Sequence, residues 1–291
     1  MERTKYNQML LPEKKIFWAD NPITGNSVIL IPGLPAFIMF STNDDVVVKE
    51  LFWTEFTGWE FISLLLWNYM TLKSSGHVLD IGSYSGIYSL IAALNHENEV
   101  YAFDIQKVCV DRVNKNRDAN NFSNITSHHK GLTDKNGETI YHYNQEDNFL
   151  TSIASLKKRK AHDSTQKVTI EKGDDALKNL IHEGKITNIK IDVEDLEKQT
   201  LKGLKNTIEL HNPNLLIEIL HITEVRKVKK LLPKNYHCYR IQETSSTILP
   251  FHKWIPNRKI GRNYLFTTDK SLLNDFKFHL PESISNKFSS I

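Results

Sequence analysis

The stretch from Val78 to Leu94 constrains the fold more than any other part of this sequence. It begins with a short apolar run that is typical of a buried strand, and Gly82 ends this run where the backbone has to turn sharply. Four apolar residues between positions 87 and 94 then recur at the i, i+3, i+4, i+7 spacing of one helical face. The first amides of such a helix are unpaired and lie at the positive end of its dipole. Strand, turn and helix together therefore predict a binding site for an anion or a nucleotide.

The spacing of the glycines distinguishes between cofactors. A dinucleotide-binding turn has the pattern Gly-x-Gly-x-x-Gly, but Tyr84 stands where its middle glycine would be. The sequence instead reads Asp-x-Gly-x-x-x-Gly over residues 80–86, which resembles the first motif of Rossmann-like methyltransferases that depend on S-adenosylmethionine. A second apolar run leads to Asp104, 22 residues after Gly82, and Rossmann-type sites place an acid about 20 residues on to bind ribose hydroxyls. The alternative is an ordinary βαβ unit with a surface aspartate.

Length and composition favour one elaborated domain with a substantial core, since the chain has 291 residues of which 40% are hydrophobic. Lys plus Arg total 37 and Asp plus Glu 34, and this small excess of +3 does not suggest a dedicated nucleic-acid binder. Two distant cysteines, Cys109 and Cys238, imply no disulfide framework. The first residues are not typical of a signal peptide, so we expect a cytoplasmic protein. The longest apolar run, residues 28–40, is too short to span a membrane.

The chain divides into three parts by pattern. We expect an N-terminal extension over residues 1–57, a main domain over 58–280 and a polar tail over 281–291. The extension is expected to contain short strands at residues 28–31, 36–40 and 45–48.

A second informative stretch, residues 189–197, reads as a strand that ends in acids and is followed by a helix. Asp192 and Glu194 fall at the carboxyl end of this strand, and ligands of open parallel sheets bind outside such ends. Lys190 shares their parity, so all three side chains would face one side if the strand continued that far. The next strand buries an acid, Glu218, with His221 three residues later. A carboxylate within an apolar run needs a partner or a function.

Several motifs occur in the same order as in the FkbM family of S-adenosylmethionine-dependent methyltransferases, which the chain resembles from about residue 45 to 268. They are Trp59-Glu60, Asp80 to Gly86, Gly131 to Glu138, Asp174 to Leu177, Lys190 to Glu194, Glu218 with His221, and Asn263 to Phe266. The Lys-Ile-Asp-Val-Glu segment is the most specific of them. The family usually has glycine after Asp-Val-Glu, whereas Asp195 stands here, which removes backbone freedom at that position.

The resemblance implies an α/β protein with a Rossmann-like fold, in which a mostly parallel, seven-stranded, doubly wound sheet follows the β-containing extension. It implies S-adenosylmethionine as cofactor and O-methylation of a hydroxyl on a sugar, a glycan or a small natural product. The cofactor-binding residues it implies are Glu60, Asp80, Gly82, Ser83, Gly86 and Asp104. The residues it places in the reaction crevice, as catalytic candidates, are Asp192, Glu194, Glu218 and His221.

Methyl transfer to an alcohol requires alignment of the reacting atoms and benefits from a base near the hydroxyl proton. Asp192 and His221 are the candidates for this base. A divalent ion held by Asp192 and Glu194 is an alternative, but no His or Cys ligand spacing accompanies them, and we expect no metal. A non-catalytic S-adenosylmethionine- or nucleotide-binding protein is a second possibility because of Asp195. An NAD-dependent oxidoreductase is disfavoured by the missing glycine. The identity of the acceptor and the oligomeric state do not follow from the sequence.

Overall fold

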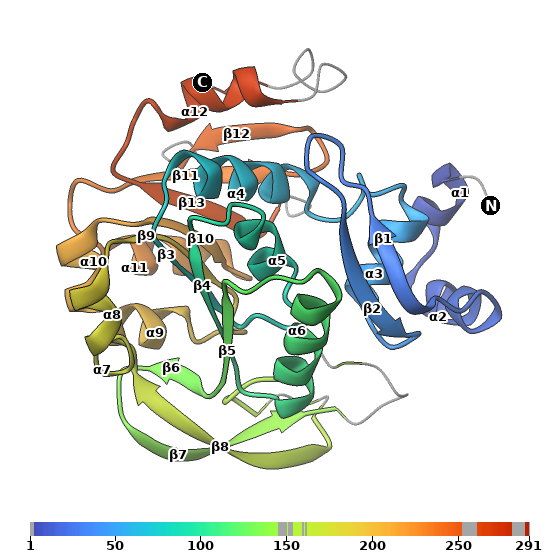
Figure 1. The fold of residues 1–291 in the computed structure, drawn as a ribbon, viewed down its shortest axis with the longest axis horizontal. Coiled ribbons are helices and arrows are strands. Elements are labelled where there is room, and N and C mark those ends of the chain that lie inside the picture. Colours follow the sequence, from blue (N-terminus) through green and yellow to red (C-terminus); the bar gives the residue numbers. More distant parts are fainter. Residues whose placement is uncertain are drawn as a thin grey trace.

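A large mixed sheet forms the centre of the molecule (Figure 1). The structure is a computed structural model that describes residues 3–144, 150, 154–158, 160, 162–251, 261–280 and 289–290. Within these residues the sheet has nine strands, in the spatial order β14 (Ser289–Ser290), β12 (Thr247–Pro250), β11 (His237–Gln242), β13 (Asn263–Thr267), β10 (Asn214–Glu218), β9 (Ile186–Ile191), β3 (His77–Ile81), β4 (Glu99–Asp104) and β5 (Ile125–His129).

The predicted mostly parallel, doubly wound sheet is confirmed. Strands β10, β9, β3, β4 and β5 pair in parallel, and β13 is antiparallel to both β10 and β11. If the seven strands from β5 to β11 are numbered in chain order, they lie in the order 3-2-1-4-5-7-6. Two further strands, β12 and β14, extend the sheet beyond the expected seven. Strand order reverses between β3 and β9, which is where open α/β sheets bind ligands.

Successive residues of β3 enter different cores, because side chains alternate across a strand. Val78 joins the core on one face of the sheet, while Leu79 and Ile81 join the core on the other. The first face carries α4 (Phe61–Lys73), α5 (Ile87–Ala93) and α6 (Lys107–Ala119). The second face carries α9 (Glu197–Gly203), α10 (Lys205–His211) and α11 (Ile222–Lys229), with α7 (Gly173–Ala176) and α8 (Lys178–Glu183) beside them.

A small three-stranded sheet lies beneath the large one in the view of Figure 1. Its strands, in spatial order, are β6 (Gly131–Thr133), β8 (Ser164–Lys172) and β7 (Gly137–Tyr143). The Thr200 hydroxyl of α9 donates a hydrogen bond to the carbonyl of Leu132 at 3.0 Å, which ties β6 to the helical layer.

The N-terminal segment lies beside α6 (Figure 1). It consists of α1 (Arg3–Gln8), α2 (Leu11–Asp20), β1 (Thr24–Ile29), β2 (Phe37–Thr42) and α3 (Val46–Trp53). The strand expected at 36–40 is confirmed as β2. The strand expected at 28–31 overlaps β1 only at residues 28–29, and β1 and β2 form an antiparallel pair. The strand expected at 45–48 is wrong, because Asp45 accepts hydrogen bonds from the amides of Val47 and Val48 and so begins a helix. This cap and the burial of one helical face outweigh the strand preference of three successive valines.

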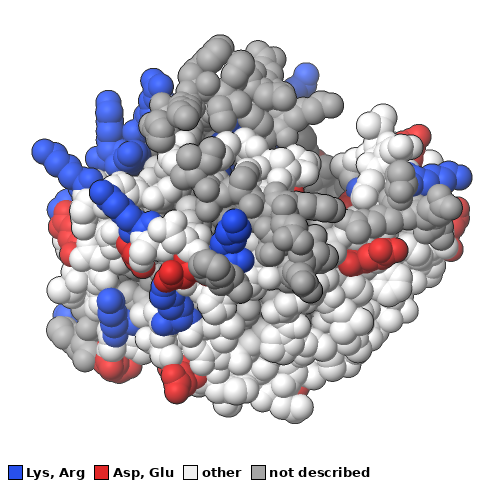
Figure 2. Space-filling model, turned by 90° about the horizontal axis from the view of Figure 1, so that it is seen from above, with Lys and Arg blue, Asp and Glu red and all other residues white. Residues whose placement is uncertain are grey.

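The C-terminal part adds α12 (Leu272–Phe276) and the short 3-10 helix η2 (Lys277–His279). The tail expected over 281–291 falls outside the described residues, except for residues 289–290, which pair with β12. No helix in the described ranges combines the length and the apolar character needed to cross a bilayer. Seen from above, basic and acidic side chains lie near one another on the left of the molecule, and the lower half of this face is mostly uncharged (Figure 2).

Candidate active site

A cavity of about 330 Å³ opens at the carboxyl ends of β3, β4, β9 and β10. This volume lies in the range of small-molecule sites, roughly 300–1,000 Å³. Each strand contributes the residues at its end, among them Ser83, Asp104, Asp192 and Glu218. Residues far apart in the sequence therefore line one cavity at the point where the strand order reverses.

The turn after β3 fits only a glycine at position 82. Gly82 has a φ of 82°, and a Cβ added there would lie 1.7 Å from the carbonyl oxygen of Asp192. The amide of Asp192 donates to the carbonyl of Ile81 at 2.8 Å, which brings the two strand ends together. Gly86 has a φ of 87° and begins α5. Gly86 contributes to the turn through its backbone conformation, and it is not among the described residues that line the cavity.

Two polar side chains of the turn region lie at the cavity wall. The Ser83 hydroxyl is buried and has no hydrogen-bond partner among the described residues. The Asp104 carboxyl accepts hydrogen bonds from the amides of Tyr84, at 2.9 Å, and Gln106, at 2.8 Å. Burial raises the pKa of Asp104 to about 7, even though both amides lower it. This half of the cavity presents a hydroxyl and a carboxyl group to a ligand.

Lys190 lies at the centre of a polar cluster on the other side of the cavity. Its side chain is 1% exposed, and its Nζ lies 3.0 Å from Asp192 Oδ2 and 3.5 Å from Asn263 Oδ1. The ammonium also lies 4.8 Å from the centre of the Tyr88 ring. Burial lowers the pKa of Lys190, but the nearby carboxylates, chiefly Asp192, outweigh burial and raise it overall. The lysine is therefore charged at neutral pH.

Two further acids complete this polar cluster. Burial and the neighbouring Asp192 raise the pKa of Glu218 to about 10, so Glu218 is neutral at pH 7 and shares a hydrogen bond with Asp192. The carboxyl of Glu60 accepts a hydrogen bond from the Tyr88 hydroxyl at 2.6 Å, and burial raises its pKa. One buried ammonium thus stands among three acids, of which Glu218 carries a proton.

Most of the site residues predicted from the sequence line this cavity. They are Glu60, Gly82, Ser83, Asp104, Asp192, Glu194 and Glu218. Glu60 lies in the cluster around Lys190 rather than at the glycine turn. Strand β9 ends at Ile191 and Glu194 has a φ of 50°, so the strand parity that joins Lys190 and Asp192 does not extend to Glu194.

Asp80 and His221 are not among the lining residues. Asp80 lies beneath the turn, where its carboxyl accepts a hydrogen bond from Ser89 at 2.6 Å, and burial raises its pKa to about 6. His221 is exposed at the position that precedes α11. The strand before it carries Glu218 to the cavity, but the chain then turns away toward the surface. The structure therefore corrects the expectation that His221 lines the crevice.

Sequence reasoning missed several parts of the wall. Val46 and Val47 of α3 line the cavity, as do Tyr84, Tyr88 and Arg262. The tyrosine at the place of the middle glycine was the only visible signal among them. Within the described residues no group of three His, Cys, Asp or Glu side chains is placed to hold a metal ion.

The fold and the site define a Rossmann-like α/β protein of the type that binds nucleotide cofactors at the carboxyl edge of its sheet. The sequence profile of the Methyltransferase FkbM domain matches residues 80–241, more than half of the chain. The chain belongs to the FkbM methyltransferase family. No curated protein sequence matches it.

Solved structures of methyltransferases are similar at low identity. Methyltransferase FkbM from Methylobacillus flagellatus KT is 19% identical, with a TM-score of 0.42, over 69% of this chain and 47% of that one. The present chain thus spans about half the length of that protein. A SAM-dependent methyltransferase from Agrobacterium tumefaciens is 12% identical over 85% and 71% of the two chains, with a TM-score of 0.44. The O-methyltransferase TomG from Streptomyces achromogenes, in complex with SAM, is 11% identical over 71% and 79%, with a TM-score of 0.42.

Proposed function

We propose that this protein is an S-adenosylmethionine-dependent methyltransferase that methylates a hydroxyl of a sugar, a glycan or a small natural product. The observation that carries the proposal is one cavity with two chemically different halves. One half holds Ser83 and Asp104 at the glycine turn, and the other holds the cluster around Lys190 and Asp192. Membership of the FkbM family supports the reaction class.

The first half fits the nucleoside part of the cofactor. Each Asp104 oxygen accepts one amide, which leaves lone pairs for the ribose hydroxyls. Within the described part of the chain the buried Ser83 hydroxyl has no hydrogen-bond partner, and such a group is costly unless a ligand satisfies it. Gly82 allows the close approach of the turn to the main chain of Asp192. When bound, S-adenosylmethionine supplies an electrophilic methyl group for in-line displacement.

The second half fits the acceptor. Asp192 accepts the proton of the acceptor hydroxyl, a contribution that is worth about 100- to 10,000-fold in comparable enzymes. Lys190 holds Asp192 in place at 3.0 Å, and the neutral Glu218 shares a hydrogen bond with it. The two neighbours fix the orientation of the base, whose side chain is 28% exposed and so remains accessible from the cavity.

Binding of S-adenosylhomocysteine and of NAD to the purified protein, measured by thermal shift and calorimetry, tests the cofactor. We expect stabilisation by S-adenosylhomocysteine and none by NAD, whereas stabilisation by NAD alone would reject the proposal. Transfer of labelled methyl groups from S-adenosylmethionine to a panel of hydroxylated sugars and glycans then tests the acceptor class. Cofactor binding without transfer to any hydroxyl compound, but with transfer to amines or thiols, would contradict O-methylation.

A further inference from the structure

Helix α6 and its C-cap residue Asn120 face the N-terminal segment with three polar side chains at fourfold spacing, Arg112, Asn116 and Asn120. The Asn116 side chain accepts from the amide of Phe40 at 2.7 Å. The Asn120 side chain accepts from the amide of Ile38 and donates to its carbonyl, both at 2.7 Å. The two asparagines form hydrogen bonds with backbone groups on the edge of β2 that faces away from β1, as a neighbouring strand would. These bonds fix β2 against α6.

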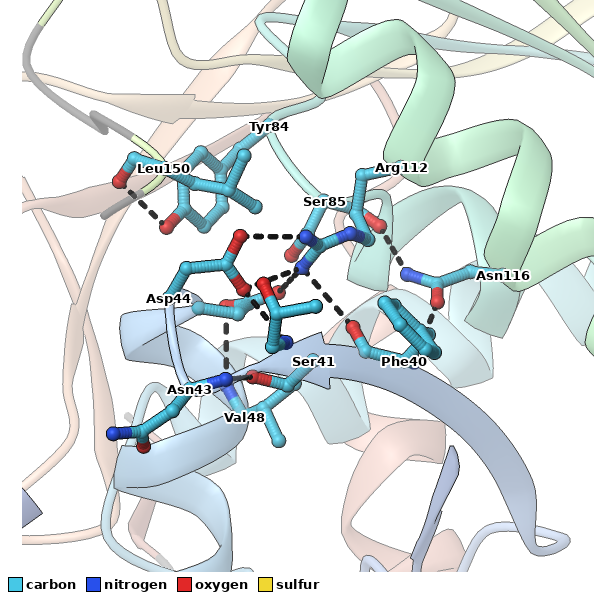
Figure 3. A network of polar contacts seen from close by, with 12 residues as sticks. Phe40, Ser41, Asn43, Asp44, Val48, Tyr84, Ser85, Arg112, Asn116 and Leu150 are labelled. Atoms are coloured by element: carbon cyan, nitrogen blue, oxygen red, sulfur yellow. Dashed lines mark hydrogen bonds and ion pairs between the residues drawn. The ribbon is translucent and has the colours of Figure 1, made fainter. Parts of the chain in front are cut away.

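Arg112 and Asp44 form a buried ion pair at the end of β2 (Figure 3). Arg112 Nη2 lies 2.6 Å from Asp44 Oδ2, Nη1 lies 3.1 Å from Oδ1, and the two side chains are 8% and 12% exposed. The same Nη1 donates to the carbonyl of Phe40 at 3.1 Å. Burial raises the pKa of Asp44, but hydrogen bonds from Arg112 and Thr42 outweigh burial and lower it overall. The pair therefore holds a charged carboxylate where α3 begins.

The hydrogen bonds around Asp44 and Asn116 extend to residues 82–86, the turn after β3 that we call the cofactor turn, at two points (Figure 3). The Asn116 side chain donates to the carbonyl of Ser85 at 2.8 Å. The amide of Leu150 donates to the carbonyl of Asp44 at 3.0 Å, and the Tyr84 hydroxyl donates to the carbonyl of Leu150 at 3.0 Å. Tyr84 and Ser85 are thus tied to the N-terminal segment through the backbone of Leu150 and the side chain of Asn116.

The conformation of Tyr84 gives this network its importance. Tyr84 has a φ of 50°, a left-handed conformation that is unfavourable for a residue with a side chain and persists only where its surroundings impose it. Its amide donates to Asp104 at 2.9 Å. Holding Tyr84 in place therefore also holds the carboxyl group that faces the ribose position.

We propose that the N-terminal segment is required for cofactor binding, with Asp44 and Arg112 as positioning residues. The ion pair holds the segment in the position in which Val46 and Val47 form a wall of the cavity. It also holds Tyr84, whose amide orients the Asp104 carboxyl toward the cavity. The ligand class is an adenosine-containing compound, and the inference rests on the proposed function. The segment lies before residue 80, outside the range that the family profile matches.

Calorimetric binding of S-adenosylhomocysteine to the full chain tests this role in Asp44→Asn and Arg112→Gln variants. We expect the Kd to rise about tenfold or more, as it does when the competent conformation is populated in about a tenth of the molecules. Tyr84→Phe keeps the ring and removes the hydroxyl with its hydrogen bonds to the backbone of Leu150 and Val46, and we expect a smaller rise, about threefold. Circular dichroism establishes the folded fraction of each variant.

Lys14→Gln is the matched control. Lys14 and Glu50 form a partly buried ion pair of 2.7 Å, 15% and 16% exposed, that joins α2 to α3 within the same segment and does not contact the cofactor turn. We expect a lower melting temperature but a Kd within about twofold of the wild type. If Asp44→Asn and Arg112→Gln lose thermal stability and still bind like the wild type, the inference is wrong.

The remaining outcomes are also decisive. Should both charge variants fail to fold, an unchanged Kd in Tyr84→Phe overturns the inference and a raised one supports it. A wild-type protein that does not bind S-adenosylhomocysteine removes the proposed function and this inference together. Binding by the wild type with unaffected variants removes only the inference.

Discussion

The backbone of Gly82 packs against that of Asp192 so closely that a Cβ on Gly82 would lie 1.7 Å from the Asp192 carbonyl oxygen. This contact joins the turn after β3 to the end of β9. It places the expected cofactor half of the cavity beside the carboxylate expected to act on the acceptor.

Gly82→Ala should therefore disrupt the site and the fold around it. The added carbon collides with main chain that cannot move independently, so we expect a loss of about 3 kcal/mol or more in the free energy of unfolding, measured by chemical denaturation. Gly25→Ala is the matched control, because Gly25 has a φ of 83° but no atom within 4 Å of its added Cβ. It should cost about 1 kcal/mol. Equal losses in both variants would mean that the contact with Asp192 is unimportant.

The affinity for S-adenosylhomocysteine should rise with pH through the titration of Asp104. Its pKa is raised from 3.8 to about 7 in the ligand-free protein, while ribose hydroxyls donate best to the carboxylate. Below pH 7 binding must also remove a proton, so Kd falls by up to about tenfold per pH unit as pH rises toward 7, and then levels off. Asp104→Asn should bind more weakly and without this slope in calorimetric titrations, and a slope that persists would exclude Asp104.

The same titration has the opposite sign for stability. The folded state favours the protonated form of Asp104, so this group makes the ligand-free protein less stable as pH rises from about 4 to 7. Denaturation of Asp104→Asn should lack this contribution, and its stability should decline less than that of the wild type over the same interval.

Asp192→Asn should lower turnover by about 100-fold or more, with the Kd for S-adenosylhomocysteine within a few-fold of the wild type, because the amide cannot accept the acceptor proton. Glu218→Gln should retain turnover within about threefold at pH 7.5, since an amide replaces a carboxyl that is already neutral there. Methyl-transfer rates with the acceptor found in the panel check both. Full activity in Asp192→Asn would remove it as the base.

His221→Ala is the control for the acid cluster. The side chain is exposed and is not among the described residues that line the cavity, so turnover should stay within about twofold of the wild type. A drop as large as that of Asp192→Asn would restore the expectation drawn from the sequence.

Asp195→Gly should change little. Asp195 has a φ of 74°, its amide donates to Glu197 at 2.9 Å, and its carbonyl accepts from Lys157; glycine retains both main-chain contacts and adopts this φ without strain. We expect unchanged turnover and a stability change below about 1 kcal/mol. Asp195→Val should lose about 1–2 kcal/mol in denaturation, because a β-branched residue resists this conformation. Large gains in turnover from Asp195→Gly would show that the aspartate impairs the enzyme.

Much of the sheet and the cavity followed from local patterns. The strand–turn–helix unit around Gly82 was predictable because strand and helix periods differ and glycine marks the turn. Asp104, Asp192 and Glu218 could be expected at one edge because the carboxyl ends of parallel strands share it. The prediction that His221 lines the crevice was wrong because no sequence period indicates the direction that a loop takes after a strand. Helix α3 was missed because three successive valines are typical of a strand.

The sequence by itself determined the strand–turn–helix unit around Gly82 and the acids at the ends of the strands, since these follow from local periodicity and backbone freedom. Only the tertiary structure decided the wall formed by α3, because Asp44 and Arg112 are 68 positions apart and meet through packing alone. It also decided that Glu218 is neutral, because its pKa depends on burial beside Asp192. The protonation of a carboxyl group and the walls of a cavity both depend on residues that are neighbours in space, not in the sequence.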